Sequence, residues 1–178
     1  TTVLAGDAIA HKSSDAYLFL QGTELRADVA LRDLDAVLDI DANGDGQLSW
    51  AEVKAARENI ERYVSAGIGL GSCALSRRDF ALEKRSDGTY AALTFDTVCA
   101  QGLTPSAAMI RYTLFAAVDP THRAIARVQS GSGTPELRLL DPRQFQSAEA
   151  TPTAITHDPG VMKAALTIAV TASPPAAA

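Results

Sequence analysis

Residues 41–52 have the residue types and the spacing of a calcium-binding loop. Side-chain oxygens stand at the first, third, fifth, ninth and twelfth positions, and the seventh residue offers its backbone carbonyl. Ca²⁺ takes about 6–8 oxygen ligands, whereas Mg²⁺ prefers fewer and zinc or copper prefer softer ones. Gly46 occupies the sixth position, where such a loop turns sharply. The expected calcium ligands are Asp41, Asn43, Asp45, Gln47, Ser49 and Glu52, with both carboxylate oxygens of Glu52 closing the site.

A turn rich in Asn, Asp and Gly before a helix is the alternative interpretation, because these residues are common in turns. Calcium binding is favoured because the five side-chain positions, the glycine and the apolar Leu48 at the eighth position agree in one register of the EF-hand pattern. The chain shows one such loop, without the partner loop with which EF-hands commonly pair. We therefore expect Ca²⁺ to have a structural role rather than to act as a switch.

The elements on either side of the loop must position these ligands. Ser49 and Glu52 form the Ser-x-x-Glu pattern of a capping box, and apolar residues then recur at helical spacing. This predicts a helix over residues 50–66, with Gly67 as its end. Before the loop only residues 33–38 indicate a helix, so the EF-hand has a truncated first helix.

The rest of the chain is mostly strand, to judge from its alternating apolar residues. About eight short strands at regular spacing predict a mainly β fold, an antiparallel β-sandwich of the Ig-like kind over residues 11–150. The EF-hand loop and one α-helix form an insertion in it at about residues 32–67. The strands are expected at residues 17–21, 24–31, 75–85, 90–98, 109–118, 124–129, 136–140 and 144–148.

Composition excludes several classes of function. The chain has 178 residues and a formal net charge of −5, and no Lys/Arg run exceeds two residues, so we expect no nucleic-acid partner. No run of about 20 apolar residues occurs, so no bilayer-spanning segment is expected. The sequence has no GxSxG, HExxH or P-loop pattern, and many of its carboxylates lie in the calcium loop. We therefore expect no enzyme.

The two cysteines, Cys73 and Cys99, flank a segment that predicts a β-hairpin turning at Asp87-Gly88. In that hairpin, residues whose numbers sum to about 175 lie opposite each other, which brings both cysteines to its open end. A disulfide is favoured over two free thiols. It would contribute roughly 3 kcal/mol and would indicate an oxidising compartment.

Two histidines are candidates for a second metal site. Residues 1–10 end in a small-x-small pattern typical of a signal-peptidase site, so they are interpreted as a signal-peptide remnant or a disordered arm. Cleavage there would make His11 N-terminal, and its amino group and ring nitrogen chelate copper or nickel. His122 and Asp119 are the other candidate pair, although a turn over residues 119–122 explains both. Residues 151–178, rich in Pro, Thr and Ala, are expected to be a tail or linker.

Several short motifs follow one another at a characteristic spacing. They are residues 10–18 (AHKSSDAYL), 30–35 (ALRDLD), 85–90 (RSDGTY) and 112–115 (YTLF), followed by 119–123 (DPTHR). Over residues 10–130 the chain thereby resembles the N-terminal domain of HupE/UreJ-like bacterial membrane proteins. The resemblance implies a periplasmic or extracellular domain that membrane helices of the same polypeptide tether to the inner membrane. The nickel handling of some relatives belongs to their membrane part, and an unknown protein partner is expected for the domain itself.

Three functions are compatible with these features. The first is a calcium-stabilised extracytoplasmic module that binds a partner or ligand. The second is a domain that captures nickel or copper for a transporter. The third is a dockerin-like adhesive module, which is the least favoured because dockerins carry two such loops and this chain has one.

Overall fold

The computed structural model of the chain describes residues 15–100 and 103–145. Predictions about residues 1–10, His11 and residues 151–178 lie outside these ranges. The first elements along the chain are β1 (Asp15–Gln21), β2 (Glu24–Ala30), α1 (Leu31–Leu38) and α2 (Trp50–Gly67). They are followed by β3 (Ile68–Leu70), β4 (Ala74–Arg85), β5 (Gly88–Val98), a 3-10 helix (Ala107–Met109), β6 (Ile110–Tyr112), β7 (Arg123–Gln129) and β8 (Glu136–Leu140).

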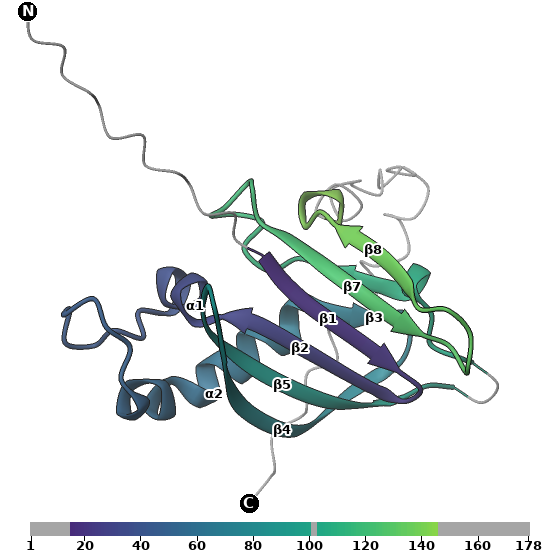
Figure 1. Ribbon diagram of the computed structural model, residues 1–178, viewed down its shortest axis with the longest axis horizontal. Helices are drawn as coiled ribbons and strands as arrows, with labels where there is room; N and C mark the ends of the chain where they lie inside the picture. The colour runs from purple at the N-terminus through teal and green to yellow at the C-terminus, as the bar shows by residue number, and fades with distance from the viewer. Residues whose placement is uncertain (1–14, 101–102, 146–178) are drawn as a thin grey trace, which may run out of the picture.

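Six strands form one sheet in the order β4-β5-β2-β1-β7-β8 (Figure 1), and β3 pairs with β6 in a second, two-stranded sheet. The mainly β fold predicted from the sequence is confirmed. The expectation of purely antiparallel pairing is corrected at one place, because β1 and β7 run parallel, from Asp15 opposite Arg123 to Gln21 opposite Gln129. Parallel pairing needs a long crossover connection, which the segment between β1 and β7 provides, whereas the tight turn between β1 and β2 allows only antiparallel pairing.

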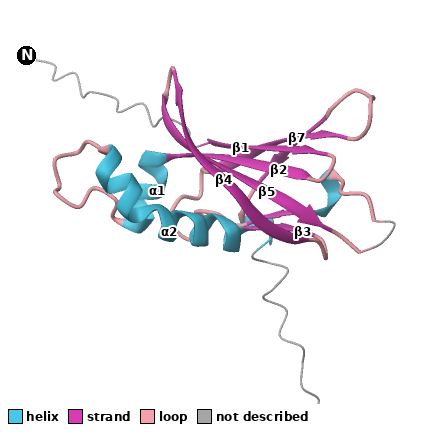
Figure 2. Ribbon diagram, turned by 90° about the horizontal axis from the view of Figure 1, so that it is seen from below, coloured by secondary structure: helices cyan, strands magenta, loops and turns pink. Residues whose placement is uncertain are grey.

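The core lies between the six-stranded sheet and the helices. Figure 2 shows α1 and α2 on the same side of this sheet. The apolar residues that alternate along β1 and β2 are fully buried, such as Leu18 and Leu25, and so is Phe95 of β5. The helix α2 adds Val53, Ile60 and Val64 to the same cluster. Burial of these side chains fixes which face of α2 turns towards the sheet.

The helix after the loop agrees with its prediction to within one residue. Ser49 Oγ accepts a hydrogen bond from Glu52 N at 3.3 Å, and Glu52 Oε2 accepts one from Ser49 N at 2.9 Å, so the capping box is confirmed. The helix ends at Gly67, and the backbone becomes extended at Ile68, the first residue of β3. A side chain at position 67 would clash, because a Cβ on Gly67 would lie 2.1 Å from Leu114 Cδ2. The helix α1 begins two residues before its predicted start.

The predicted strand over residues 109–118 is mostly wrong, since only its first part forms β6. The backbone then turns, and the end of α2 holds the turn in place. Thr113 N donates a hydrogen bond to Gly67 O at 2.8 Å, and Phe115 N donates one to Tyr63 Oη at 3.0 Å. These hydrogen bonds satisfy the backbone of the turn, so its apolar residues Leu114 and Phe115 are buried although they are not part of a strand.

The strand predicted over residues 144–148 is not present where the structure describes it. Residues 144 and 145 are helical, and residues 146–148 lie outside the described ranges. None of the helices in residues 15–100 and 103–145 has the length and apolar character needed to span a membrane.

Candidate metal centre

The loop of residues 41–52, which is predicted to bind calcium, is held at both ends. At its start, Asp39 ends α1 with a left-handed backbone (φ 48°) and donates its N–H to Asp35 O at 2.9 Å. Ile40 is buried, and Asp41 N donates a hydrogen bond to Asp35 Oδ1 at 2.8 Å. At its end, Ser49 caps α2. The short helix α1 therefore fixes where the first ligand begins, despite having only eight residues.

The first ligand position organises the turn of the loop. Asp41 Oδ1 accepts hydrogen bonds from Gly44 N at 2.9 Å and Asp45 N at 3.2 Å. Its other oxygen, Oδ2, accepts one from Gly46 N at 2.7 Å. Gly46 has φ 77°, a left-handed conformation that a side chain would strain, which explains the glycine at this position.

The remaining ligand positions join the same hydrogen-bond network. Asn43 Oδ1 accepts from Asp45 N, and Asp45 Oδ1 accepts from Gln47 N, both at 2.8 Å. Glu52 reaches back from the first turn of α2: its Oε1 lies 3.4 Å from Asn43 N, and its Oε2 accepts from Ser49 Oγ at 2.7 Å. The twelfth position thus lies against the third and the ninth.

In the described part of the chain, no three His, Cys, Asp or Glu side chains form a group that could hold a metal ion. The carboxylates of the loop instead accept hydrogen bonds from backbone N–H groups and from Ser49. The three acidic residues of the expected set, Asp41, Asp45 and Glu52, do not form such a group. The other three expected ligands are neutral oxygens: the Asn43 amide, the Gln47 carbonyl and the Ser49 hydroxyl. Calcium binding by the loop therefore stays a prediction.

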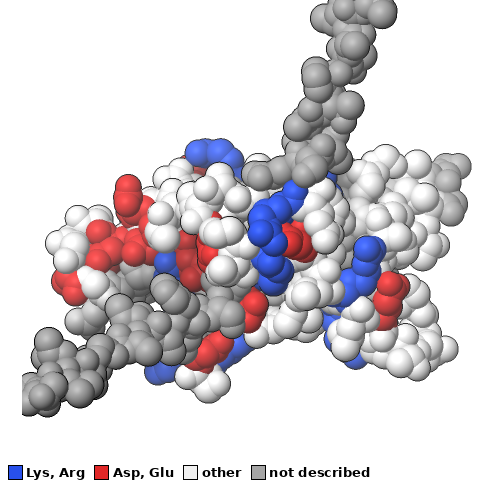
Figure 3. All heavy atoms as spheres, turned by 90° about the horizontal axis from the view of Figure 1, so that it is seen from above, with Lys and Arg blue, Asp and Glu red and all other residues white. Residues whose placement is uncertain are grey.

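The charge of this region suits a cation. Hydrogen bonds from the Ser49 hydroxyl and backbone lower the pKa of Glu52 below its usual value, so the carboxylate is ionised at neutral pH. Acidic side chains gather at the end of the molecule where α1 and the loop lie (Figures 1 and 3). The sequence places Asp33, Asp35, Asp39, Asp41 and Asp45 in this short stretch.

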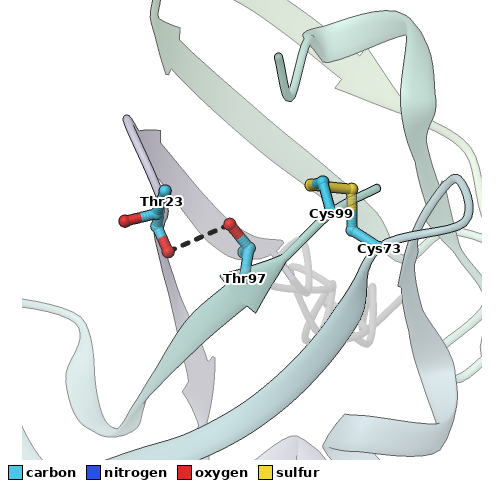
Figure 4. The surroundings of a disulfide bond; sticks show 4 residues. All are labelled: Thr23, Cys73, Thr97 and Cys99. Atoms are coloured by element: carbon cyan, nitrogen blue, oxygen red, sulfur yellow. Dashed lines mark hydrogen bonds between the residues drawn. A yellow bond between two sulfur atoms is a disulfide. The ribbon is translucent and has the colours of Figure 1, made fainter. Parts of the chain in front are cut away.

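The disulfide predicted between Cys73 and Cys99 is confirmed, with a Cα–Cα distance of 4.1 Å (Figure 4). It joins the open ends of β4 and β5, directly beyond the pair Ala74 and Val98. The hairpin turns one residue earlier than predicted, between Arg85 and Gly88, and a bulge near residue 78 shifts its register. Together these differences bring the cysteines face to face. The bond indicates an oxidising, extracytoplasmic environment.

The hydrogen-bonded Thr97 and Thr23 tie the same end of the sheet together. Thr97 N and Oγ1 both donate to Thr23 O, at 2.7 and 3.0 Å (Figure 4). Thr23 lies in the turn between β1 and β2, so β5 is fixed to that turn two residues before Cys99. The disulfide therefore closes an end of the sheet that is already held by hydrogen bonds.

The second candidate ligand, His122, is fully buried. Its Nε2 lies 2.6 Å from Tyr112 Oη, and its ring packs edge-on against Phe115 at 4.5 Å between centroids. Asp119 Oδ1 accepts hydrogen bonds from Thr121 N at 2.8 Å and His122 N at 3.2 Å, so the predicted turn is present. The side chain of His122 serves the core in this arrangement, and His11 lies outside the described residues.

The buried His122 predicts a loss of stability in mild acid. Burial lowers its pKa below 6.5, although the nearby carboxylates of Asp33 and Asp119 oppose this. The unfolded chain therefore binds more protons than the native protein as the pH falls below 6.5, and stability decreases. We expect protonation of this histidine to lower the free energy of unfolding by at most about 1.4 kcal/mol between pH 7.5 and pH 5.5.

Urea denaturation of the wild type and of His122→Gln at both pH values measures this effect. The glutamine keeps a polar group beside Tyr112 but does not titrate. We expect the variant to be less stable at pH 7.5 and to change less between the two pH values. An equal loss in both proteins would show that other groups cause the pH dependence.

Sequence reasoning missed a buried charge on β2. Asp28 is fully buried, and its Oδ1 accepts a hydrogen bond from Arg26 Nε at 2.7 Å, while Arg85 pairs with its Oδ2. The Arg85 guanidinium also lies 4.6 Å from the ring centroids of Tyr17 and Tyr90. A signal was present: Arg26 and Asp28 alternate with buried Leu25, Ala27 and Val29, which places both on the face away from the helices.

Neither the models of known protein families nor the curated proteins contain a match to this chain. The likeness to HupE/UreJ-like proteins therefore rests on the motifs in the sequence and enters below as part of a proposal.

Proposed function

We propose that the chain is a calcium-binding extracytoplasmic domain in which Ca²⁺ is structural. The observation that carries this is the closure of the loop by Glu52, whose carboxylate reaches back to Asn43 N and Ser49 Oγ while Asp41 reaches forward to Gly46 N. Glu52 thus joins the last ligand position to the third and the ninth through hydrogen bonds. Binding of Ca²⁺ would then hold the start of α2 against the end of α1.

The location forms the second part of the proposal. The disulfide supports an oxidising compartment outside the cytoplasm. Calcium modules outside cells bind at about 10⁻⁴–10⁻³ M, where ambient calcium keeps them loaded. Together with the motif resemblance, this favours the periplasmic part of a HupE/UreJ-like membrane protein, with membrane helices of the same polypeptide and a protein partner. We propose a binding role and not a catalytic one.

The two alternative functions, metal capture and dockerin-like adhesion, have fewer observations in their support. Capture of nickel or copper would use His11 or His122, and the ring nitrogen Nε2 of His122 already lies beside Tyr112 Oη. A dockerin-like adhesive role would use the same loop as the main proposal, but dockerins carry two loops. No contact among the described residues favours either alternative.

Calcium is expected to stabilise the protein against heat. With 10 mM CaCl₂ and the affinity range above, mass action predicts about 1.4–2.7 kcal/mol of added stability. Glu52→Gln should lose most of this gain because it removes the carboxylate that closes the site. Thermal melts of both proteins with CaCl₂ and with EGTA measure the difference.

The matched control is Glu58→Gln, which makes the same change on the exposed side of α2 outside the loop. It should respond to Ca²⁺ as the wild type does. Tb³⁺ luminescence excited through Trp50, the single tryptophan of the chain and the tenth residue of the loop, locates the ion independently. The proposal fails if Ca²⁺ does not raise the melting temperature of the wild type.

A further inference from the structure

A cavity of about 400 Å³ lies where the calcium loop, α1, α2 and the tip of the β4–β5 hairpin meet. Its volume falls within the roughly 300–1,000 Å³ of small-molecule sites. Most of its wall is apolar, as is usual for such sites. The larger apolar residues of the lining are Leu31 of α1, Leu48 of the loop, Trp50 and Val53 of α2, and Leu82 of β4.

The indole of Trp50 is the most unusual part of this wall, because 60% of its surface is exposed. An exposed tryptophan at a concave apolar surface is the arrangement found at energetically important binding contacts. Val53, three residues further on, is buried and fixes the helix face from which Trp50 projects. The indole is therefore held beside the cavity by a rigid element.

Two charged residues of opposite sign line the cavity. Asp87 in the hairpin turn accepts a hydrogen bond from Tyr90 Oη at 2.7 Å, which engages its carboxylate. Arg32 of α1 pairs with Asp33 at 3.1 Å, and its side chain remains 44% exposed. The Arg32 guanidinium places a positive charge and a planar set of N–H donors at the cavity, which suits an anionic group.

We propose that this cavity binds an amphiphile, with an apolar ring or chain against Leu48, Trp50 and Leu82 and an anionic group at Arg32. The calcium loop supplies part of the wall, since Gly46, Leu48 and Trp50 are its sixth, eighth and tenth residues. Gln47 and Ser49 alternate with these three residues along the loop. Ca²⁺ would fix the Gln47 carbonyl and the Ser49 side chain, and would thereby fix the shape of the cavity wall. Calcium therefore strengthens amphiphile binding; this dependence rests on the proposed function.

Two fluorescent probes with the same aromatic body test the assignment. 1-Anilinonaphthalene-8-sulfonate carries a sulfonate, and N-phenyl-1-naphthylamine does not. With Ca²⁺ present, both should bind at one saturable site and quench Trp50 emission. The sulfonate probe should bind about tenfold more tightly, because a hydrogen bond to an ionised group adds affinity. EGTA should weaken both probes by about threefold or more.

Variants separate this cavity from general apolar surface. Leu82→Asp places a charge in the wall, and Thr89→Phe fills the space from β5, so either should abolish binding of both probes while circular dichroism shows a folded protein. Arg32→Gln should remove only the preference for the sulfonate. The matched control is Leu139→Asp, a change of an equally apolar and 67% exposed leucine on β8, which should leave binding unchanged.

Several outcomes would overturn the inference: no saturable binding, equal loss with Leu139→Asp, or no effect of either cavity variant. Equal affinity of the two probes would overturn the anionic group, and equal affinity with Ca²⁺ and EGTA would overturn the calcium dependence. Thermal melts without either probe, with CaCl₂ and with EGTA, test calcium binding separately. Stabilisation by Ca²⁺ without probe binding would leave the proposed function intact and reject the amphiphile site.

Discussion

Replacing Asp28 with alanine is expected to lower the free energy of unfolding by about 3 kcal/mol or more. The carboxylate is fully buried and is shared by Arg26 and Arg85, whose side chains are 34% and 29% exposed. Removal of the anion takes the buried partner away from both partly desolvated guanidinium groups, although Arg26 keeps its contact with Glu83 at 3.2 Å. Arg85 would also lose the contact that holds it over Tyr17 and Tyr90. Urea denaturation followed by circular dichroism measures the loss.

Asp96→Ala provides the matched control for this prediction. Asp96 pairs with Arg78 at 3.0 Å on the same sheet, but both side chains are about half exposed. Exposed ion pairs contribute about 0–1 kcal/mol, so this variant should unfold close to the wild-type midpoint. The prediction is contradicted if both variants lose the same stability, because burial of the charge would then have no consequence.

Removing the disulfide by changing Cys73 and Cys99 to alanine is expected to cost about 3.5 kcal/mol in the chain-entropy account. The estimate follows from the sequence separation of 26 residues between the two cysteines. The unfolded chain gains freedom when this loop opens, whereas the folded hairpin stays paired through β4 and β5. Chemical denaturation of the oxidised wild type and of the double variant measures the difference.

Reduced wild-type protein is the control that separates the bond from the packing of the sulfurs. It keeps both thiols, and Cys73 is only 9% exposed. Reduction should therefore cause most of the decrease in the free energy of unfolding. The alanine variant should be slightly less stable than the reduced wild type, because it also lacks the packed sulfurs. If oxidised and reduced protein unfold at the same denaturant concentration, the bond contributes nothing to stability.

Local features of the sequence predicted the structure around the loop well. The capping box of Ser49 and Glu52, the helical spacing after it and Gly46 all act within a few residues of the chain, so the sequence contains their cause. The disulfide was also predictable, because a tight turn near Asp87 sets which residues of one hairpin face each other. The turn one residue earlier than predicted and the bulge near residue 78 both shift the register towards direct pairing of the two cysteines.

Features that depend on distant partners could not be predicted. The alternation of residues 109–118 indicated a strand, but the partner that decides the backbone there is the end of α2, through Gly67 and Tyr63. The strands β3 and β6 are three residues each and too short for a periodic signal. The parallel pairing of β1 with β7 leaves no mark in either strand taken alone.

The candidate sites also differ in whether their residues come from one segment of the chain or from several. Each expected calcium ligand lies in one continuous segment, which is why the sequence alone could propose the loop. The Asp28 cluster, in which Arg85 also contacts Tyr17 and Tyr90, and the cavity at Trp50 instead combine residues from three or more elements. Their residue types are visible in the sequence, but nothing in it shows that β4 brings Arg85 to Asp28 or Leu82 to the loop of residues 41–52.

The position of β1 between β2 and β7 also governs when the domain can finish folding. A chain that emerges from its N-terminal end, from a ribosome or through a translocation channel, exposes β1 long before Arg123–Gln129 follows. Until then one edge of a central strand has no hydrogen-bond partner, which is a state prone to aggregation. The β4–β5 hairpin, by contrast, is local and can oxidise early. We therefore expect β7 docking to be the slow, committing step of folding, because it joins the most distant segments of the sheet.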